Sequence, residues 1–362
     1  MGHAMSTFQE FSAAARNRKA VPIFVVSLDA LGTLYGFREP IVVQYLKAAH
    51  QCGLDTRAIK PEALQKSFRA TFKRYSQDFP NYGKGKLNHP EEWWTRLLGE
   101  TFTDVTKHQA SIPSKLAPML YEQFSSKDAY ELYPDSVSFL QTMHALKDQY
   151  SDPDGPLLCV GVITNSDPRA ESVLKSLGLQ VGPSKPVAIP AQILPMGGHK
   201  ARLLLSKSKY DRGNDIDFLA TSYDAGVEKP ASGIWAYAEA FTQGIASVRA
   251  ENSLGIPLHG RSVEQSTDDY KNILIESLRV SDGKVSWIHI GDDMTKDYEG
   301  ARQYGHHALH LDRGDNKGPA RSTRTWSPSE HTVSSLEEAA LIVNVMAQDH
   351  FKANPAAKVM AS

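Results

Sequence analysis

Several apolar stretches alternate with amphipathic segments along most of the chain. Continuously apolar strands are typical of a parallel sheet that helices cover on both faces, whereas a sheet with one wet face shows alternation. The stretches predicted to be strands are Ile23–Leu28, Leu157–Ile163, Phe218–Ser222, Val285–Ile290 and Ala308–Leu311. Helices are predicted between or after them at Pro168–Leu177, Gly233–Phe241 and Lys296–Tyr304. This alternation predicts an α/β fold with a doubly wound parallel sheet.

A long segment with helical periodicity separates the first two predicted strands. One crossover between parallel strands needs far fewer residues, so residues 39–134 are predicted to form a separate all-helical insertion. Its predicted helices are Glu39–Cys52, Pro61–Phe79, Pro90–Phe102 and Pro113–Phe124. A proline at the start of the last three fits the first turn of a helix.

The rest of the chain then divides around this insertion. Residues 21–38 and 135–350 are predicted to form one Rossmann-like core, preceded by an N-terminal tail at 1–20. Prolines and polar residues interrupt the core pattern at 181–215 and 243–283, which are predicted to be further insertions. The first of them contains a basic segment, 200–212, which either binds a polyanion or forms a solvated surface.

Composition excludes several classes of partner. The 362 residues carry 40 basic and 41 acidic side chains, a net charge of −1, which does not favour nucleic acid or an acidic membrane surface. The apolar stretches are all shorter than the roughly 20 residues that span a bilayer. Cys52 and Cys159 lie in apolar surroundings, so we expect no disulfide and a reducing intracellular compartment. The oligomeric state is not indicated.

The expected compartment is the cytoplasm, with the mitochondrion as the alternative. The stretch from Phe8 to Lys19 contains three basic side chains and few acids, as a mitochondrial presequence does. A solvated terminus can have the same composition. If the stretch is such a terminus, the expected compartment is the cytoplasm.

Polar side chains follow the predicted strands at the points where the strands end. They are Asp29 after the first strand, Thr164 and Asn165 after the second, Lys229 after the third, and Asp292 and Asp297 after the fourth. In open α/β sheets, ligands bind at the carboxyl ends of the strands, so we expect these groups to meet. Each has an ordinary alternative as a turn former, a helix cap or a surface lysine. Their occurrence in order, each after its own strand, favours a common site.

This set of groups suits phosphoryl transfer. Asp29 is the candidate nucleophile, which would attack phosphorus and form an acyl-phosphate. Asp29, Asp292 and Asp297 offer the oxygen ligands that Mg²⁺ prefers, and the ion would offset the repulsion between carboxylate and phosphate. Thr164 and Lys229 are the candidates for holding the other phosphoryl oxygens. The predicted substrate is a small phosphorylated molecule.

Four short motifs in this order resemble the signatures of the haloacid dehalogenase superfamily: "DALGTL", "VGVITNS", "GVEKP" and "IGDDMTKDYEGA". The resemblance implies that Asp29 is the nucleophile and that Thr164, Asn165 and Lys229 bind phosphate. It implies that Asp292 ligates Mg²⁺ directly and that Asp297 ligates it or orients a ligand through water. The helical insertion is similar to the cap of this superfamily, which closes over the site and selects the substrate.

A stretch of the insertion, "FPNYG" followed by "EEWW", is similar to a narrower animal branch of the same superfamily. The similarity covers residues 21–180, 217–242 and 284–312, and it leaves out the two later insertions. Trp93 and Trp94 lie in this stretch. They are expected to belong to the core of the insertion, with a substrate-binding wall as the alternative.

Leu31 is the departure from the pattern. The resemblance implies a second aspartate at this position, since most phosphatases of the superfamily have one, which protonates the leaving oxygen and later activates water. Dehalogenases also lack it, but they need no metal and replace the first acid of the last motif, which is kept here as Asp292. The metal ligand implied at position 31 is a backbone carbonyl, which leucine supplies.

Three functions therefore remain open. The leading hypothesis is a Mg²⁺-dependent phosphatase that works through an aspartyl-phosphate on Asp29 without the usual second aspartate. The alternatives are a binding protein of the same fold with impaired catalysis and a metal-independent, dehalogenase-like hydrolase.

Overall fold

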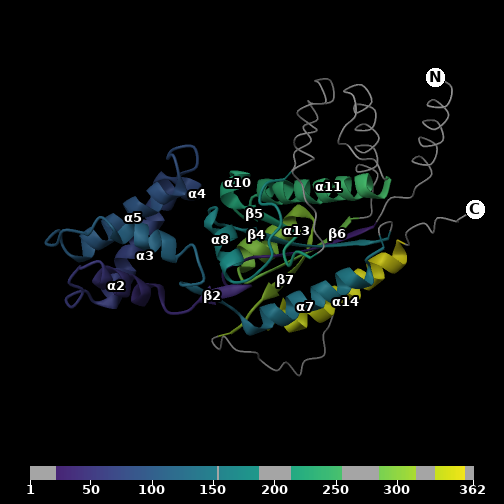
Figure 1. Ribbon diagram of the computed structural model, residues 1–362, viewed down its shortest axis with the longest axis horizontal. Helices are drawn as coiled ribbons and strands as arrows, with labels where there is room; N and C mark the ends of the chain where they lie inside the picture. The colour runs from purple at the N-terminus through teal and green to yellow at the C-terminus, as the bar shows by residue number, and fades with distance from the viewer. Residues whose placement is uncertain (1–21, 153–154, 187–212, 255–284, 315–330, 355–362) are drawn as a thin grey trace, which may run out of the picture.

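The computed structural model describes residues 22–152, 155–186, 213–254, 285–314 and 331–354 (Figure 1). Six strands form one parallel sheet in the order β5-β4-β1-β6-β7-β8. Their bounds are β1 Ile23–Leu28, β4 Leu157–Thr164, β5 Phe218–Thr221, β6 Val285–Gly291, β7 His307–Leu311 and β8 Thr332–Val333. This confirms the predicted α/β class and all five predicted strands, and each predicted strand end lies within one residue of the observed end.

Strand β1 lies inside the sheet, between β4 and β6. Val26 pairs with Val160 on β4 and with Ile288 on β6, and every residue of β1 is buried. Between β4 and β5 the packing is close. A Cβ at Gly161 would collide with the ring of Phe218, so glycine leaves room for that ring. Strand β8 was not predicted, because two residues are too short to show a pattern.

Helices cover both faces of the sheet, as the apolar strands require. One face packs against α7 (Pro134–Gln149), α8 (Arg169–Ser176) and α14 (Leu336–Ala353). The other packs against α11 (Ser232–Leu254) and α13 (Gly300–Tyr304), with Trp235 and Phe241 fully buried between helix and strands. Figure 1 shows α7 and α14 side by side on one face and α11 on the other. The short helix α10 (Ser222–Ala225) follows β5 directly.

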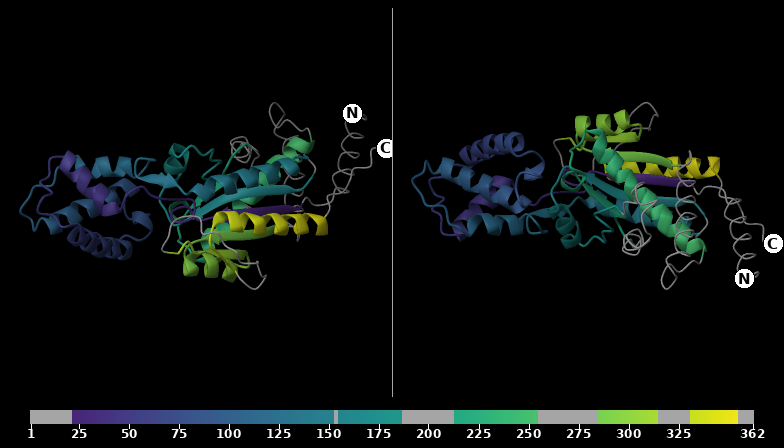
Figure 2. Two further views of the ribbon diagram at one scale, coloured as in Figure 1. Left: turned by 90° about the horizontal axis from the view of Figure 1, so that it is seen from below. Right: turned by 90° about the horizontal axis from the view of Figure 1, so that it is seen from above.

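A separate group of helices, here called the helical module, comprises α2 to α6 and has its own core around Trp93, Leu97 and Phe102. The bounds are α2 Ile41–Gln51, α3 Pro61–Asp78, α4 Pro80–Gly83, α5 Pro90–Val105 and α6 Leu116–Gln123. Figure 2 shows the module projecting from one end of the sheet. Trp93 is 1% exposed and is therefore a core residue, as expected.

The two chain crossings into the helical module pair with each other. Strands β2 (Tyr35–Phe37) and β3 (Tyr130–Leu132) form an antiparallel ribbon in which Tyr35 lies opposite Leu132. This ribbon was not predicted, because its two halves are short and lie almost a hundred residues apart in the chain. The module thus leaves the core through a hydrogen-bonded stem.

Some predicted helix bounds were wrong. Helix α6 begins at Leu116, so Pro113 lies in the preceding loop and does not start a helix. The helix predicted at Lys296–Tyr304 is a π-helix, η2 (Met294–Glu299), followed by α13. Helix α11 continues to Leu254, so the insertion predicted to begin at residue 243 starts inside a helix. Ile245 of this helix is buried and belongs to the core.

Several predictions lie outside the described residues. They are the tail at 1–20, the basic segment at 200–212, and most of the insertions at 181–215 and 243–283. At the start of the first insertion, Val181 forms a β-bridge with Ile216, so its two ends lie together. Cys52 and Cys159 are both buried, and neither forms a disulfide, as expected. Among the described helices, none has the length and apolarity that a bilayer span requires.

Candidate functional site

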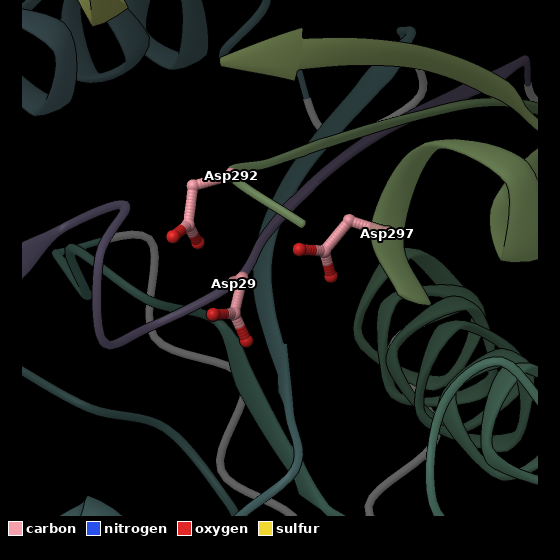
Figure 3. Close-up of side chains that lie close together, drawn as sticks. All are labelled: Asp29, Asp292 and Asp297. Carbon is pink, nitrogen blue, oxygen red and sulfur yellow. The ribbon is translucent and has the colours of Figure 1, made fainter. Parts of the chain in front are cut away.

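Three carboxylates meet at the carboxyl end of the sheet (Figure 3). Asp29 directly follows β1, Asp292 directly follows β6, and Asp297 lies in η2. Their carboxyl groups lie close together, and one oxygen of each lies within 4.8 Å of the others. The structure therefore brings together the three carboxylates that the sequence placed at strand ends.

The turn after β1 determines where Asp29 and Asp292 lie. The carbonyl of Ala30 accepts hydrogen bonds from the amides of Leu34 at 2.8 Å and Tyr35 at 3.2 Å, which closes the turn. Gly32 has φ +95°, a conformation that favours glycine. A Cβ at this residue would also collide with the Asp292 carboxylate. The backbone of the first motif thus lies directly against the carboxylate of the last one, and the Thr33 hydroxyl donates to Asp292 Oδ1 at 3.3 Å.

Lys229 supplies the positive charge of the site. Its side chain is 2% exposed, and its Nζ donates to Asp29 Oδ1 at 2.7 Å, to Asp297 Oδ1 at 2.6 Å and to the Ile163 carbonyl at 2.7 Å. An ammonium group has three N–H donors, so these three bonds use all of them. To donate a hydrogen bond to a bound anion, Lys229 would therefore have to release one of these partners.

Asn165 holds Lys229 in place with its side-chain amide. Its Oδ1 accepts from the Lys229 backbone N–H at 2.7 Å, and its Nδ2 donates to the Lys229 carbonyl at 3.0 Å. The sequence predicted a phosphate-binding role for Asn165, but both ends of its amide are occupied by this backbone. Thr164 is 4% exposed at the end of β4, where it pairs with Thr221 of β5. Its assignment to phosphate stays a prediction.

A buried hydrogen-bond chain behind Asp297 was missed from the sequence. His289 lies within 3.2 Å of Asp297 Oδ1 through Nε2 and within 2.8 Å of the Ser27 hydroxyl through Nδ1. Ser27 also accepts from Trp287 Nε1 at 2.7 Å. The sequence did contain a signal for this chain of hydrogen bonds, namely a histidine inside the apolar strand "VSWIHIG". A buried imidazole needs hydrogen-bond partners.

Burial and like charge govern the titration of this cluster. Burial raises the pKa of Asp29, while the Lys229 ammonium opposes that rise. Burial, together with the charges of Asp29 and Asp297, raises the pKa of Asp292 to about 6. Burial alone would lower the pKa of Lys229, but Asp29 and Asp297 raise it. Lys229 is thus paired with Asp29 and Asp297 but not with Asp292, and the excess of negative charge in the cluster suits an additional cation.

The oxygen donors of this cluster fit Mg²⁺. The ion prefers carboxylate and carbonyl oxygens and keeps several waters, so it does not need a closed protein cage. Asp29, Asp292 and Asp297 would supply the carboxylates. Leu31, whose side chain is 39% exposed, leaves no carboxylate at its position, and the role of its carbonyl as a ligand stays a prediction.

Replacing Asp292 with asparagine should weaken Mg²⁺ binding by about tenfold or more, because it removes one charged oxygen ligand. Calorimetric titration with MgCl₂ measures the affinity. Asp293→Asn is the matched control, since it makes the same charge change one residue away. The Asp293 carboxylate accepts from the backbone N–H groups of Thr295 and Lys296 instead of facing the cluster. Equal affinity in the Asp292 variant and the wild type would show that the ligand set is wrong.

Comparison with known proteins relates most of the chain to one group of proteins. A haloacid dehalogenase-like hydrolase domain-containing protein 3 of Danio rerio is 26% identical over 88% of this chain and 95% of its own length. The protein of the same name from Bos taurus is 24% identical over 86% of this chain and 90% of its own length. An uncharacterised protein of Saccharomyces cerevisiae is 25% identical over 83% of this chain and 76% of its own length.

No model of a known protein family matches the sequence. Among solved structures, a HAD hydrolase of Bacillus subtilis bound to magnesium is 12% identical, with a TM-score of 0.42 over 90% of this chain and 100% of that chain.

Proposed function

Because the chain belongs to the haloacid dehalogenase superfamily of hydrolases, we propose that it is a Mg²⁺-dependent phosphatase of a small phosphorylated molecule. The observation that carries this proposal is the strand-end cluster, in which Asp29 lies 2.7 Å from the Lys229 ammonium and faces Asp292 and Asp297. A carboxylate in such a place can serve as a nucleophile, and its neighbours can hold a divalent cation.

Asp29 Oδ2 is the proposed attacking atom, since Oδ1 is engaged by Lys229. In the first step, the Oδ2–phosphorus bond forms, and the bond between phosphorus and the leaving oxygen breaks. The leaving oxygen keeps the electron pair. In the second step, the oxygen of a water molecule bonds to phosphorus and the Oδ2–phosphorus bond breaks, so that Asp29 regains its carboxylate, inorganic phosphate leaves, and the proton of the water passes to solvent. Mg²⁺ held by the carboxylates would offset the negative charge of the phosphoryl group.

Leu31 narrows the class of substrate. At its position no side chain can protonate the leaving oxygen, and the missing general acid typically costs about 10²- to 10⁴-fold in rate. The cost is small when the leaving group is already stable as an anion. We therefore expect a substrate with a good leaving group, or one that supplies its own proton.

Phosphate release and halide release distinguish the three hypotheses. A panel of phosphorylated metabolites and one activated aryl phosphate is assayed with and without Mg²⁺, and a 2-haloacid is assayed for halide. We expect phosphate release from the aryl phosphate that requires Mg²⁺. Halide release without metal would instead support a dehalogenase, which Leu31 by itself favours. No turnover of any compound would support a binding protein.

A further inference from the structure

The turn α4 at the tip of the helical module contacts the loops that carry the site. The Tyr82 hydroxyl donates to the Asn165 carbonyl at 2.9 Å, and Asn81 Nδ2 donates to the Ser222 carbonyl at 2.8 Å. Lys84 Nζ donates to the Asp224 carbonyl at 2.8 Å and also to the Tyr223 carbonyl. All these acceptors are backbone carbonyls, one in the loop after β4 and the others in the short helix α10 that follows β5.

One of these contacts leads directly to the candidate catalytic groups. Asn165, which accepts from Tyr82, holds the backbone of Lys229 through both atoms of its side-chain amide. Lys229 in turn bridges Asp29 and Asp297. A continuous series of hydrogen bonds therefore runs from the helical module through Asn165 and Lys229 to Asp29.

Two residues of α4 that make this contact have an unfavourable backbone conformation. Asn81 has φ +50° and Tyr82 has φ +57°, in the left-handed region. Asparagine tolerates that region, but a bulky residue such as tyrosine seldom adopts it. Residues in such conformations persist where surrounding contacts over-determine them, and they gather at ligand clamps and switches.

The surroundings of Tyr82 supply those contacts. Its ring lies nearly parallel to that of Trp94, with centroids 6.2 Å apart, and edge-on to Trp93 at 5.5 Å. Trp94 Nε1 donates to Asp167 Oδ2 at 2.7 Å, in the same loop as Asn165. Tyr82 is thus held from the module side by its ring and from the core side by its hydroxyl.

We propose that Tyr82 is a positioning residue that couples the placement of the helical module to the placement of Lys229 beside Asp29. Docking of α4 orders the loop at Asn165, and Asn165 then keeps the Lys229 ammonium on the carboxylates. Movement of the module away from the sheet would release this loop and loosen Lys229. The consequence for turnover rests on the proposed function, but the coupling itself does not.

The chemical reactivity of Lys229 tests the coupling without any turnover. Wild type and Tyr82→Phe are treated with acetic anhydride in a time course, and acetylation at each lysine is followed by mass spectrometry. Lys229 is 3% exposed, so its acetylation in the wild type should be slow. Loss of one hydrogen bond should raise its rate by about tenfold in Tyr82→Phe.

Two controls separate coupling from general loosening. Tyr75→Phe removes a hydroxyl from another tyrosine that packs on Trp93, at 5.8 Å, but Tyr75 belongs to α3 inside the helical module. Lys147, which is 6% exposed and ion-paired with Asp217 at 2.7 Å, serves as an internal reference in each sample. We expect Lys147 to be unchanged in both variants and Lys229 to be unchanged in Tyr75→Phe.

The outcomes decide the proposal in each case. An unchanged Lys229 rate in Tyr82→Phe, or a parallel rise at Lys147, would overturn it. If Lys229 alone responds, Tyr82→Phe should also lower kcat for an aryl phosphate by about tenfold and change KM by less than about threefold. If Lys229 alone responds and the wild type releases no phosphate, the coupling stands and the phosphatase proposal fails.

Discussion

Asp29→Asn should lower Mg²⁺-dependent phosphate release by on the order of 10⁴-fold, a size typical for removal of a nucleophile. The amide lacks the charge and the nucleophilic electron pair that the first step requires. It keeps the size of the side chain, and the backbone N–H of residue 29 still donates to the Ile290 carbonyl at 2.9 Å. The fold should therefore survive.

Release of phosphate from an activated aryl phosphate measures this loss, and thermal unfolding by circular dichroism checks the fold. Asp148→Asn is the matched control, because it makes the same chemical change at an exposed residue of α7, and it should keep full activity. Activity of Asp29→Asn at the wild-type level would show that another group is the nucleophile.

Leu31→Asp should raise steady-state turnover by about 10²-fold for substrates with poor leaving groups and by less for good ones. In the wild type, a good leaving group departs without proton donation, so the aspartyl-phosphate forms readily. Its hydrolysis needs an activated water, which a leucine cannot provide. The wild type should therefore show a burst of leaving group followed by a slow steady state. Because Leu31 is 39% exposed, a carboxylate can be accommodated there without burial.

Rapid-quench kinetics with two aryl phosphates of different leaving-group pKa measures this effect. Leu31→Asn is the matched control, since it has the shape of aspartate but cannot exchange a proton, and its steady state should stay slow. If neither the wild type nor Leu31→Asp forms an intermediate with Mg²⁺ present, Asp29 is not a working nucleophile. Equal wild-type turnover of poor and good leaving groups would assign the acid role to another residue.

Much of this site could be predicted because parallel strands place their carboxyl ends at one edge. Asp29 and Asp292 directly follow strands, and Lys229 lies in the loop after β5 and α10, so a correct order of apolar stretches was enough to predict that they meet. The helices of the insertion could be predicted from their periodicity, because each buries one face in the core of the helical module.

Other features had no local signal. The β2–β3 ribbon depends on two three-residue segments whose pairing is decided by the whole helical module between them. The role of Asn165 depends on where the Lys229 backbone passes, and the role of His289 depends on Ser27 in the neighbouring strand. Helix bounds at Pro113 were misjudged because proline fits a loop as well as a first turn.

The sequence by itself determined the α/β class, the strands and the types of side chain at their ends. These features can be recognised from short stretches of sequence, because the pattern of buried residues within one strand or helix involves only residues close together in the chain. Only the tertiary structure decided how the charges are shared. It gave all three Lys229 donors to Asp29, Asp297 and a carbonyl, and it brought Tyr82 onto the loop that holds this lysine. Those contacts join residues more than sixty positions apart, and distances between such residues follow from packing of the complete chain.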